Sequence, residues 1–528
     1  MIDRLNIKLD RLQILILAVA FVVSMYSFYF FMNNKVYLIG SDVFYYMSIA
    51  DSILEYGEMR DITAIPSFPV KSPQNGIVFV HVILSLFGLG AKGRILTIVV
   101  INYLLYLSGI YPLYKIARWS GLRRGLPLVS LLSVYMGAWH IYRINLLAIN
   151  DGIFNSLVLW LVFHLVKFVY GSNIDKSNLF SKYAIKNMLM ISFLVIILIQ
   201  FRLNASLILG SVVISAFAIR DYKTSAFFII VCLILIISFL FIYLFIPVGF
   251  NNIIEKIVGL ILRPVDRIGL DSDWYSNNVW YLKYQLWSVL PGLVAGLLGL
   301  TNPIATLLFT IFPFSMIYYG FRGIKEKNFL NVFIASICLS GLWFTFSYPA
   351  PHRYILYTFP FIYLILLNLK RIRWIGYAFV LLVFLQTLKL PFTGFGIGPG
   401  SELFRHIFEK KVSIPNEAVL ISKERRHPYF FLGTRTYLGD DNWKTILAHI
   451  KAPGFFVPEI TSDFIKDNGS IFVLGDSTYI EGVFSQANEI AISNGYKLEL
   501  NPLTPEKNEF KGWALVEIKY LSTNRSDN

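Results

Sequence analysis

The sequence has 528 residues, of which 56% are hydrophobic and only 15% are charged, and its mean hydropathy is +0.61. A soluble globular chain typically carries about 25% charged residues, so this composition excludes an ordinary soluble protein. The formal net charge of +15 would suggest nucleic-acid binding in a soluble protein. Here Lys and Arg fall mainly in short loops between apolar stretches, where they set membrane orientation. We therefore expect a multi-pass membrane protein with no nucleic-acid partner.

Apolar stretches long enough to cross a bilayer recur along the chain. The first has basic residues before it and no small-residue cleavage site after it, so we interpret it as a retained span. The predicted spans are residues 12–32, 94–116, 127–148, 152–170, 187–203, 205–219, 225–247, 302–321, 329–348, 353–369 and 373–391. Two shorter apolar segments, 77–90 and 287–300, are ambiguous, and the first fits an interfacial or re-entrant helix. We expect about eleven transmembrane helices, or about thirteen if both segments cross.

The basic loops between these spans all agree on one orientation. It places the N-terminus in the cytoplasm, and an odd number of spans places the C-terminus outside. We therefore predict a protein of the cytoplasmic (inner) membrane with two large outer loops, at 33–93 and 248–301. Residues 1–394 form the predicted transmembrane domain, and residues 395–528 form a predicted extracytoplasmic domain.

The tail after the last span contains short apolar runs separated by amphipathic segments, which predicts a small α/β domain. The predicted strands are Ala418–Ser422, Ser470–Leu474, Tyr496–Leu500 and Trp513–Tyr520. The predicted helices are Trp443–Lys451 and Tyr479–Asn494, the second ended by Gly495. The expected fold class is thus an all-α polytopic membrane protein with a small C-terminal α/β domain.

The most informative segment follows the first span and begins with Asp42, Tyr45 and Tyr46. From Val43 to Tyr56 the pattern predicts a helix at the membrane surface, with Gly57 as its C-terminal stop. Its polar face consists of Ser48, Asp51, Ser52 and Glu55. Asp42 then has two interpretations: an N-cap of this helix, or a base or metal-binding carboxylate under the outer leaflet.

Several further charges fall outside the membrane or near the outer ends of predicted spans. Lys71 lies between two prolines, in a turn that could present it to a lipid phosphate; the alternative is an ordinary loop lysine among headgroups. The other charges are His140, Arg143, Asp151, Arg202, Arg263, Arg267, His352 and Arg353. Charges this close to a membrane are costly unless paired or functional. The structural alternatives are snorkelling, pairing and, for Asp151, capping of the next span.

Four pieces of the sequence resemble the GT-C superfamily of polytopic glycosyltransferases, which use polyprenyl-phosphate-linked sugars. They are the run Ser41–Gly57, Lys71-Ser72-Pro73 before a short apolar helix, Asn150-Asp151-Gly152, and His352-Arg353-Tyr354 before a late span. The resemblance rests on the order and spacing of these four pieces and on their predicted location on the same side of the membrane. It is closest to the aminoarabinose and mannosyl transferase type. Two features differ. Asp42 is a single acid where many relatives have two, and the Trp-Trp-Asp signature of oligosaccharyltransferase catalytic subunits is absent.

The resemblance implies an inverting transfer of a sugar from a polyprenyl-phosphate donor to a hydroxyl of an envelope glycan, lipid or protein. Asp42 would accept the hydroxyl proton, and Asp151 would orient the acceptor or share a divalent cation, Mg²⁺ or Mn²⁺, with Asp42. The implied donor-phosphate ligands are Lys71, Arg353, Arg202, Arg263 and Arg267. The implied substrate contacts are Tyr45, Tyr46, His352 and Tyr354.

Three alternative functions remain at this stage. The first is an oligosaccharyltransferase-like enzyme, against which the missing Trp-Trp-Asp signature argues. The second is a flippase for lipid-linked sugars, a class that usually shows paired repeats, and the sequence shows none. The third is an envelope scaffold whose outer α/β domain binds glycans without chemistry.

Overall fold

The protein is described here from a computed structural model. The described residues are 11–33, 41–62, 64–65, 68–69, 76–122, 125–137, 149–171, 182–202, 205–222, 224–233, 302–345, 356–374, 376–377, 403, 406–407, 412, 414, 420–422, 436–437, 470–493, 497–505 and 512–521.

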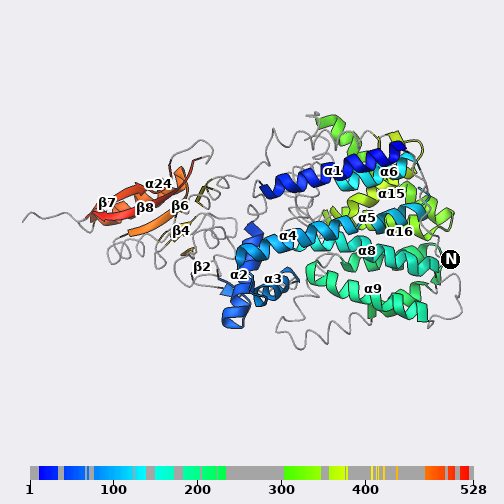
Figure 1. Ribbon diagram of the computed structural model, residues 1–528, viewed down its shortest axis with the longest axis horizontal. Helices are drawn as coiled ribbons and strands as arrows, with labels where there is room; N and C mark the ends of the chain where they lie inside the picture. The colour runs from blue at the N-terminus through cyan, green and yellow to red at the C-terminus, as the bar shows by residue number, and fades with distance from the viewer. Residues whose placement is uncertain are drawn as a thin grey trace, which may run out of the picture. The chain divides into compact units, whose positions relative to one another are not determined.

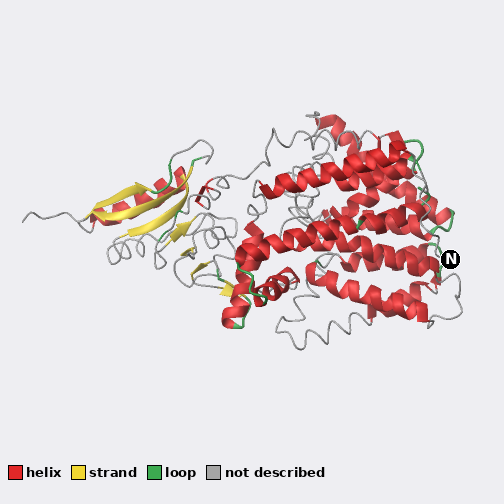
Figure 2. Cartoon of the chain, viewed as in Figure 1, coloured by secondary structure: helices red, strands yellow, loops and turns green. Residues whose placement is uncertain are grey.

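The chain packs into two compact units. The first unit consists of residues 1–37, 72–77 and 96–392, and the second of residues 38–71, 78–95 and 393–528. In the described part of the chain, every strand belongs to the second unit and most helices belong to the first (Figure 2). The first outer loop and the tail therefore pack in one unit although more than 300 residues separate them. The predicted boundary at residue 394 stays a prediction.

The first unit is a bundle of apolar helices (Figure 1). Its elements are α1 (Arg11–Asn33), most of α4 (Ala91–Ser108), α5 (Ile110–Trp119), α6 (Leu126–Gly137), α8 (Asn150–Gly171), α9 (Lys182–Phe201), α10 (Ala205–Ala218), α15 (Asn302–Lys325), α16 (Phe329–Thr345), the 3₁₀ helix η3 (Leu356–Thr358) and α18 (Phe359–Asn368). Three described stretches are long and apolar enough to cross a membrane: Arg11–Asn33, Ala91–Trp119 and Asn150–Tyr170. The predicted fold class, a mostly helical membrane protein with a small C-terminal sheet domain, is confirmed.

The span predicted at 94–116 is confirmed as one apolar stretch, Ala91–Trp119, in which α4 and α5 adjoin at Gly109. A side chain at Gly109 would collide with the hydroxyl of Tyr135 on α6. That hydroxyl donates a hydrogen bond of 2.9 Å to the carbonyl of Tyr106, and the two tyrosine rings stack with their centroids 4.3 Å apart. The missing side chain at Gly109 therefore leaves room for the hydroxyl of Tyr135.

The second unit combines the first outer loop with the tail. Its elements are α2 (Ser41–Tyr56), β1 (Arg60–Asp61), β2 (Ala64–Ile65), β3 (Phe68–Pro69), most of α3 (Gly76–Leu86), β4 (Leu420–Ser422), β5 (Thr436–Tyr437), β6 (Ser470–Asp476), α24 (Ser477–Ser493), β7 (Lys497–Pro502) and β8 (Trp513–Leu521). At 11 residues, α3 is about 16 Å long and too short to span a bilayer. It ends at Leu86 and is followed by Gly88, whose φ is +80°.

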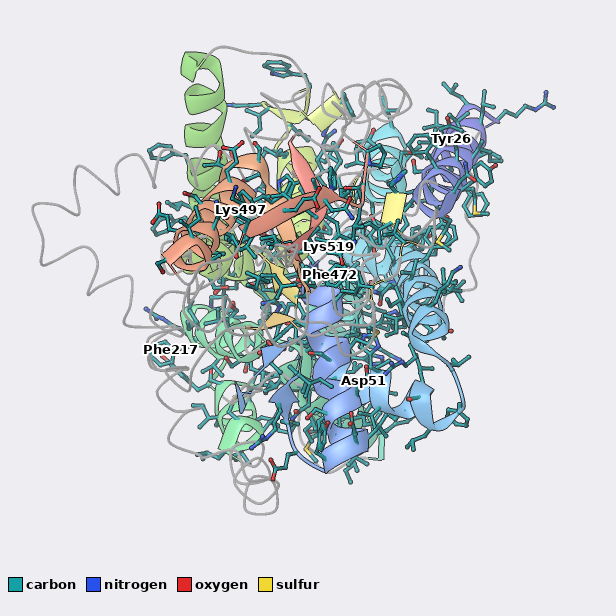
Figure 3. The ribbon with its side chains drawn as sticks, turned by 90° about the vertical axis from the view of Figure 1, so that its left-hand side faces the viewer. Tyr26, Asp51, Phe217, Phe472, Lys497 and Lys519 are labelled. Atoms are coloured by element: carbon teal, nitrogen blue, oxygen red, sulfur yellow. The ribbon has the colours of Figure 1, made fainter. Side chains whose placement is uncertain are left out.

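The tail folds around a six-stranded sheet in the order β2-β5-β4-β6-β8-β7. The first four strands are parallel to one another, and β8 runs antiparallel to both of its neighbours. Phe472 on β6, Lys519 on β8 and Lys497 on β7 mark these strands in Figure 3. One edge strand, β2, comes from the first outer loop, where Ala64 and Ile65 pair with Thr436 and Tyr437.

The central strands β6 and β8 pack against apolar clusters on both faces of the sheet. On one face, apolar side chains of α24 pack against Val473, Val516 and Ile518. On the other, Phe472 and Leu515 pack against a second apolar cluster. The four predicted strands of the tail and its second predicted helix are confirmed, while β2 and β5 were not predicted. The predicted helix 443–451 and the ambiguous segment 287–300 lie outside the described residues.

Candidate functional site

The first turn of α8 and the end of α9 carry a buried ion pair. Asp151 lies in the first turn of α8, and Arg202 directly follows the last residue of α9. An Oδ1 atom of Asp151 accepts a hydrogen bond from Nη2 of Arg202, and the two side chains are 2% and 7% exposed. The acid thus sits at the positive end of one helix dipole and the cation at the negative end of another. Each charge is stabilised by its own helix and by its partner.

The same two helix ends hold the start of α3. The backbone N–H of Ile77 donates a hydrogen bond of 3.1 Å to Oδ1 of Asn150, the residue before Asp151. A Cβ atom on Gly76 would lie 2.9 Å from ring atoms of Phe201, the residue before Arg202. Only a glycine fits this approach without displacing the ring. The N-terminus of α3 is therefore fixed beside the Asp151–Arg202 pair.

The helix that carries Asp42 is confirmed and begins two residues before the predicted start, at Ser41. Gly57 has φ +70° and its N–H bonds to the carbonyl of Ile53 at 3.0 Å, as expected for a C-terminal stop. Asp42 lies inside the first turn, so the interpretation of this residue as the N-cap does not hold. A carboxylate in that turn is still favoured by the helix dipole.

The predicted polar face of α2 is largely covered by protein, with Glu55 exposed at its end. Ser48 is fully buried and donates to Oδ1 of Asp61 on β1 at 3.4 Å, and buried Ser52 donates to a carbonyl in the following turn at 2.8 Å. Asp51, labelled on α2 in Figure 3, forms a 2.7 Å ion pair with Arg94 near the start of α4. Three of the four polar side chains of this face therefore have protein partners within the second unit.

Tyr45 and Tyr46, predicted to contact substrate, are partly buried. Their ring centroids lie 5.6 Å apart, and both pack against a small apolar core formed by α2 and α3, with Ile49, Ala50 and Val78 at its centre. These contacts give both tyrosines a structural role. Substrate contact by either of them stays a prediction.

The structure brings together two of the predicted site residues, Asp151 and Arg202, as partners of one another. Asp42, Tyr45 and Tyr46 share α2. The remaining predicted residues lie outside the described part of the chain: Lys71, Arg263, Arg267, His352, Arg353 and Tyr354.

Sequence reasoning missed three contributors to this region: Asn150, Gly76 and the Asp51–Arg94 pair. The Asn-Asp-Gly run contained a signal for the first of these, because Asn at the beginning of a helix commonly accepts a backbone N–H. Here the N–H donor belongs to another helix, α3, and a local sequence pattern cannot predict a partner 73 residues away.

The described residues give no support to a preformed metal centre. Among them, no group of three or more His, Cys, Asp and Glu side chains could hold a metal ion. In addition, the guanidinium on Asp151 places a positive charge where a cation would have to approach. The sharing of a divalent cation by Asp42 and Asp151 therefore stays a prediction.

No model of a protein family matches the sequence, and no curated protein matches it. Among solved structures, the chain is similar to the crystal structure of the Archaeoglobus fulgidus oligosaccharyltransferase in the apo form. The TM-score is 0.50 and the sequence identity 12%, over 91% of this chain and 71% of that one. The chain therefore shares the fold of that archaeal oligosaccharyltransferase.

Two further alignments are weaker. The archaeal oligosaccharyltransferase in complex with Zn and sulfate aligns at TM-score 0.49 and 13% identity, over 90% of this chain and 69% of that one. ArnT from Cupriavidus metallidurans in the apo state aligns at TM-score 0.44 and 13% identity, over 96% of this chain and 97% of that one. The assignment of the fold rests on the apo oligosaccharyltransferase alone.

Proposed function

We propose that this chain is a membrane glycosyltransferase that moves a sugar from a polyprenyl-phosphate donor to a hydroxyl acceptor on the outer face of the membrane. The observation that carries the proposal is the start of α3, fixed by Asn150 and Phe201 beside the buried Asp151–Arg202 pair. The GT-C fold supports the proposal, because a fold of this kind is compatible with the same chemistry.

The start of α3 has the properties of a phosphate-binding element. The N–H groups in the first turn of a helix point at an incoming anion, and the helix dipole favours negative charge there. Lys71 precedes Ile77 by six residues, a length of chain that reaches at most about 20 Å. We assign the donor phosphate to this helix end, to Arg202 and to Lys71. The loop cations Arg263, Arg267 and Arg353 are further candidates.

Asp42 is the proposed base. In a single displacement the acceptor oxygen attacks the anomeric carbon, its proton passes to the Asp42 carboxylate, and the bond from that carbon to the phosphate oxygen breaks. The electron pair leaves with the polyprenyl phosphate, which is a weak base and needs cations rather than a general acid. One attack from the side opposite the leaving group inverts the anomeric centre.

Asp151 has a different role in this proposal. Because its carboxylate is bonded to the Arg202 guanidinium, we assign Asp151 to holding that cation in place. It is therefore a positioning residue rather than a second base. Its removal should weaken donor binding and raise KM for the donor more than it lowers kcat.

Purified protein in proteoliposomes with a radiolabelled polyprenyl-phosphate sugar separates the candidate functions. A transferase consumes the donor and releases polyprenyl phosphate when an acceptor hydroxyl is present. A flippase moves the label across the bilayer and leaves the donor intact, and a scaffold does neither. Supplying envelope glycan, lipid and peptide acceptors in parallel identifies the acceptor class. Transfer of a whole lipid-linked oligosaccharide to peptide asparagine would instead favour the oligosaccharyltransferase alternative.

A further inference from the structure

An ion pair between Asp51 and Arg94 joins α2, the helix that carries Asp42, to the start of α4. Nη1 of Arg94 lies 2.7 Å from Oδ1 of Asp51, and the two side chains are only 6% and 24% exposed. Arg94 belongs to the first turn of α4, where its N–H donates to the carbonyl of Gly90 at 2.9 Å. All of these residues lie in the second unit, which therefore contains both the pair and the proposed base.

The place of Arg94 in its helix is unfavourable for a cation. The first turn of a helix carries the positive end of the helix dipole, and burial removes the guanidinium from water. The carboxylate of Asp51 compensates for both effects. Because a buried ion pair can often be replaced by apolar residues at little cost, its presence is weak evidence for stability. We therefore expect this pair to act through the position that it gives to α2.

Asp42 and Asp51 occupy opposite faces of α2. Nine residues separate them, which corresponds to about two and a half helical turns and about 14 Å along the axis. The position of Asp42 shares its face with Ile49 and Ile53, which pack with Val78 of α3 in the small apolar core. On the other face, Asp51 meets Arg94. The helix is thus held from two sides, and the proposed base is on the side of α3.

The polar contacts define the tilt of α2 more sharply than the apolar ones do. Burial of apolar surface is non-directional, whereas an ion pair joins two particular atoms. Ser48 adds a second polar contact by donating to Oδ1 of Asp61 at 3.4 Å. A tilt of α2 by about 5° around Asp51 displaces Asp42 by about 1 Å, given the length of helix between them. A misplacement of about 1 Å at a reacting group can lower a rate about 10²-fold.

We propose that Asp51 and Arg94 are positioning residues for sugar transfer, because their ion pair sets the tilt of α2 and thereby places the Asp42 carboxylate at the acceptor hydroxyl. This inference rests on the proposed function, in which Asp42 is the base. Neither Asp51 nor Arg94 contacts the substrate in this role. Loss of the pair should therefore lower kcat and leave KM for the donor nearly unchanged, since the donor phosphate is assigned to other residues.

Transfer of a labelled sugar by the purified full-length protein tests the proposal. Arg94→Gln should lower kcat about 10²-fold and keep KM for the polyprenyl-phosphate donor within about twofold. Arg94→Lys retains the charge and should recover part of the lost rate. The matched control is Arg60→Gln, because Arg60 forms an exposed 2.9 Å pair with Glu58 in the same unit. This control should keep the full kcat.

A double variant separates position from stability. Asp51→Leu with Arg94→Met removes both charges and should fold, because apolar residues can replace a buried pair. It should still lose at least about tenfold in kcat, since no directional contact then fixes the tilt of α2. It is also the decisive variant if Arg94→Gln does not fold. Full kcat in this double variant, or an equal change in kcat and KM, would overturn the proposal.

Hydrogen exchange of the backbone amides of α2, followed by mass spectrometry, reports on the pair without any sugar transfer. Exchange over residues 42–56 should rise severalfold in Arg94→Gln, while exchange in α8 stays unchanged. If the unmodified protein transfers sugar and Arg94→Gln keeps the full rate, the positioning role fails and the proposed function stands. If the unmodified protein transfers no sugar, the proposed function fails, and unchanged exchange in α2 would show that the pair does not hold this helix either.

Discussion

The two ends of α8 carry charge in different ways. At its start, Asp151 is buried and bonded to Arg202, so the acid and the cation balance within the protein. Near its end, Lys167 lies over the ring of Phe163, and Lys115 lies over the ring of Tyr111 on α5. The first end joins two charges of opposite sign, and the second places cations over aromatic rings.

A buried ion pair and a cation over an aromatic ring differ in how much stability is lost when one partner is removed. A buried pair is costly to break, because removing one partner leaves the other charge unbalanced in an apolar surrounding. It can therefore hold a side chain such as Arg202 in one position, as a phosphate site requires. A cation over an aromatic ring contributes only about 0.5–1 kcal/mol when it is partly exposed, so it costs little to remove.

The largest loss of stability is expected when the Asp151–Arg202 ion pair at the start of α8 is broken. Asp151→Ala leaves the Arg202 guanidinium buried without its carboxylate and should reduce the free energy of unfolding by about 3–5 kcal/mol. Denaturant titration in detergent measures the loss. Asp151→Leu combined with Arg202→Met removes both charges and should recover most of the stability.

An exposed ion pair provides the control for that loss. At the C-terminal end of α15, Nε of Arg322 lies 2.7 Å from Oε1 of Glu326, and both side chains are more than 40% exposed. Glu326→Ala should cost at most about 0.5 kcal/mol. Equal losses in Asp151→Ala and Glu326→Ala would mean that the buried pair does not carry the stability assigned to it.

A smaller effect is expected at the start of α3. Gly76→Ala brings a methyl group within 2.9 Å of the Phe201 ring and should cost about 1–3 kcal/mol through overpacking. It should also raise KM for the polyprenyl-phosphate donor, because the displaced helix end is the proposed phosphate site. Gly90→Ala is the matched control, since nothing lies within 4 Å of a Cβ there. If Gly76→Ala left the affinity for the donor unchanged, the start of α3 would not be part of the donor-binding site.

The smallest effect on stability is expected from removing the charge of Lys115, which lies over the rings of Tyr111 and Tyr114. Lys115→Gln removes a cation held by ring faces about 6 Å away and should change the free energy of unfolding by less than about 0.5 kcal/mol. The measurement is the same denaturant titration, in detergent free of anionic lipid. A decrease of more than about 1 kcal/mol in the free energy of unfolding would show that Lys115 contributes more than contacts with these two rings.

The sequence predicted most helices and the strands of the tail because their signals are local. Apolar length identifies α1 and α8, and the glycine at 57 ends α2 as expected. The strands β2 and β5 were missed because each has two residues, too few for any alternating pattern to show. They form only because partners distant in the sequence pair with them.

For the candidate site, residue types were predictable but their partners were not. Asp151 and Arg202 were both identified as exceptional charges, yet 51 residues separate them and nothing in the sequence paired them. The polar face of α2 was predicted as a surface feature, because spacing shows which residues share a face and not what covers it. Ser48 and Asp51 are covered by β1 and the start of α4.

The most direct test of the central claim is sugar transfer by Asp42→Asn. This change retains the size of the side chain at the start of α2 and removes its capacity to accept a proton. With purified protein and a labelled polyprenyl-phosphate sugar, the turnover rate should fall by about 10²-fold or more. Glu55→Gln, an exposed acid on the same helix, should retain the full rate. Full activity in Asp42→Asn would contradict the assignment of the base and with it the proposed mechanism.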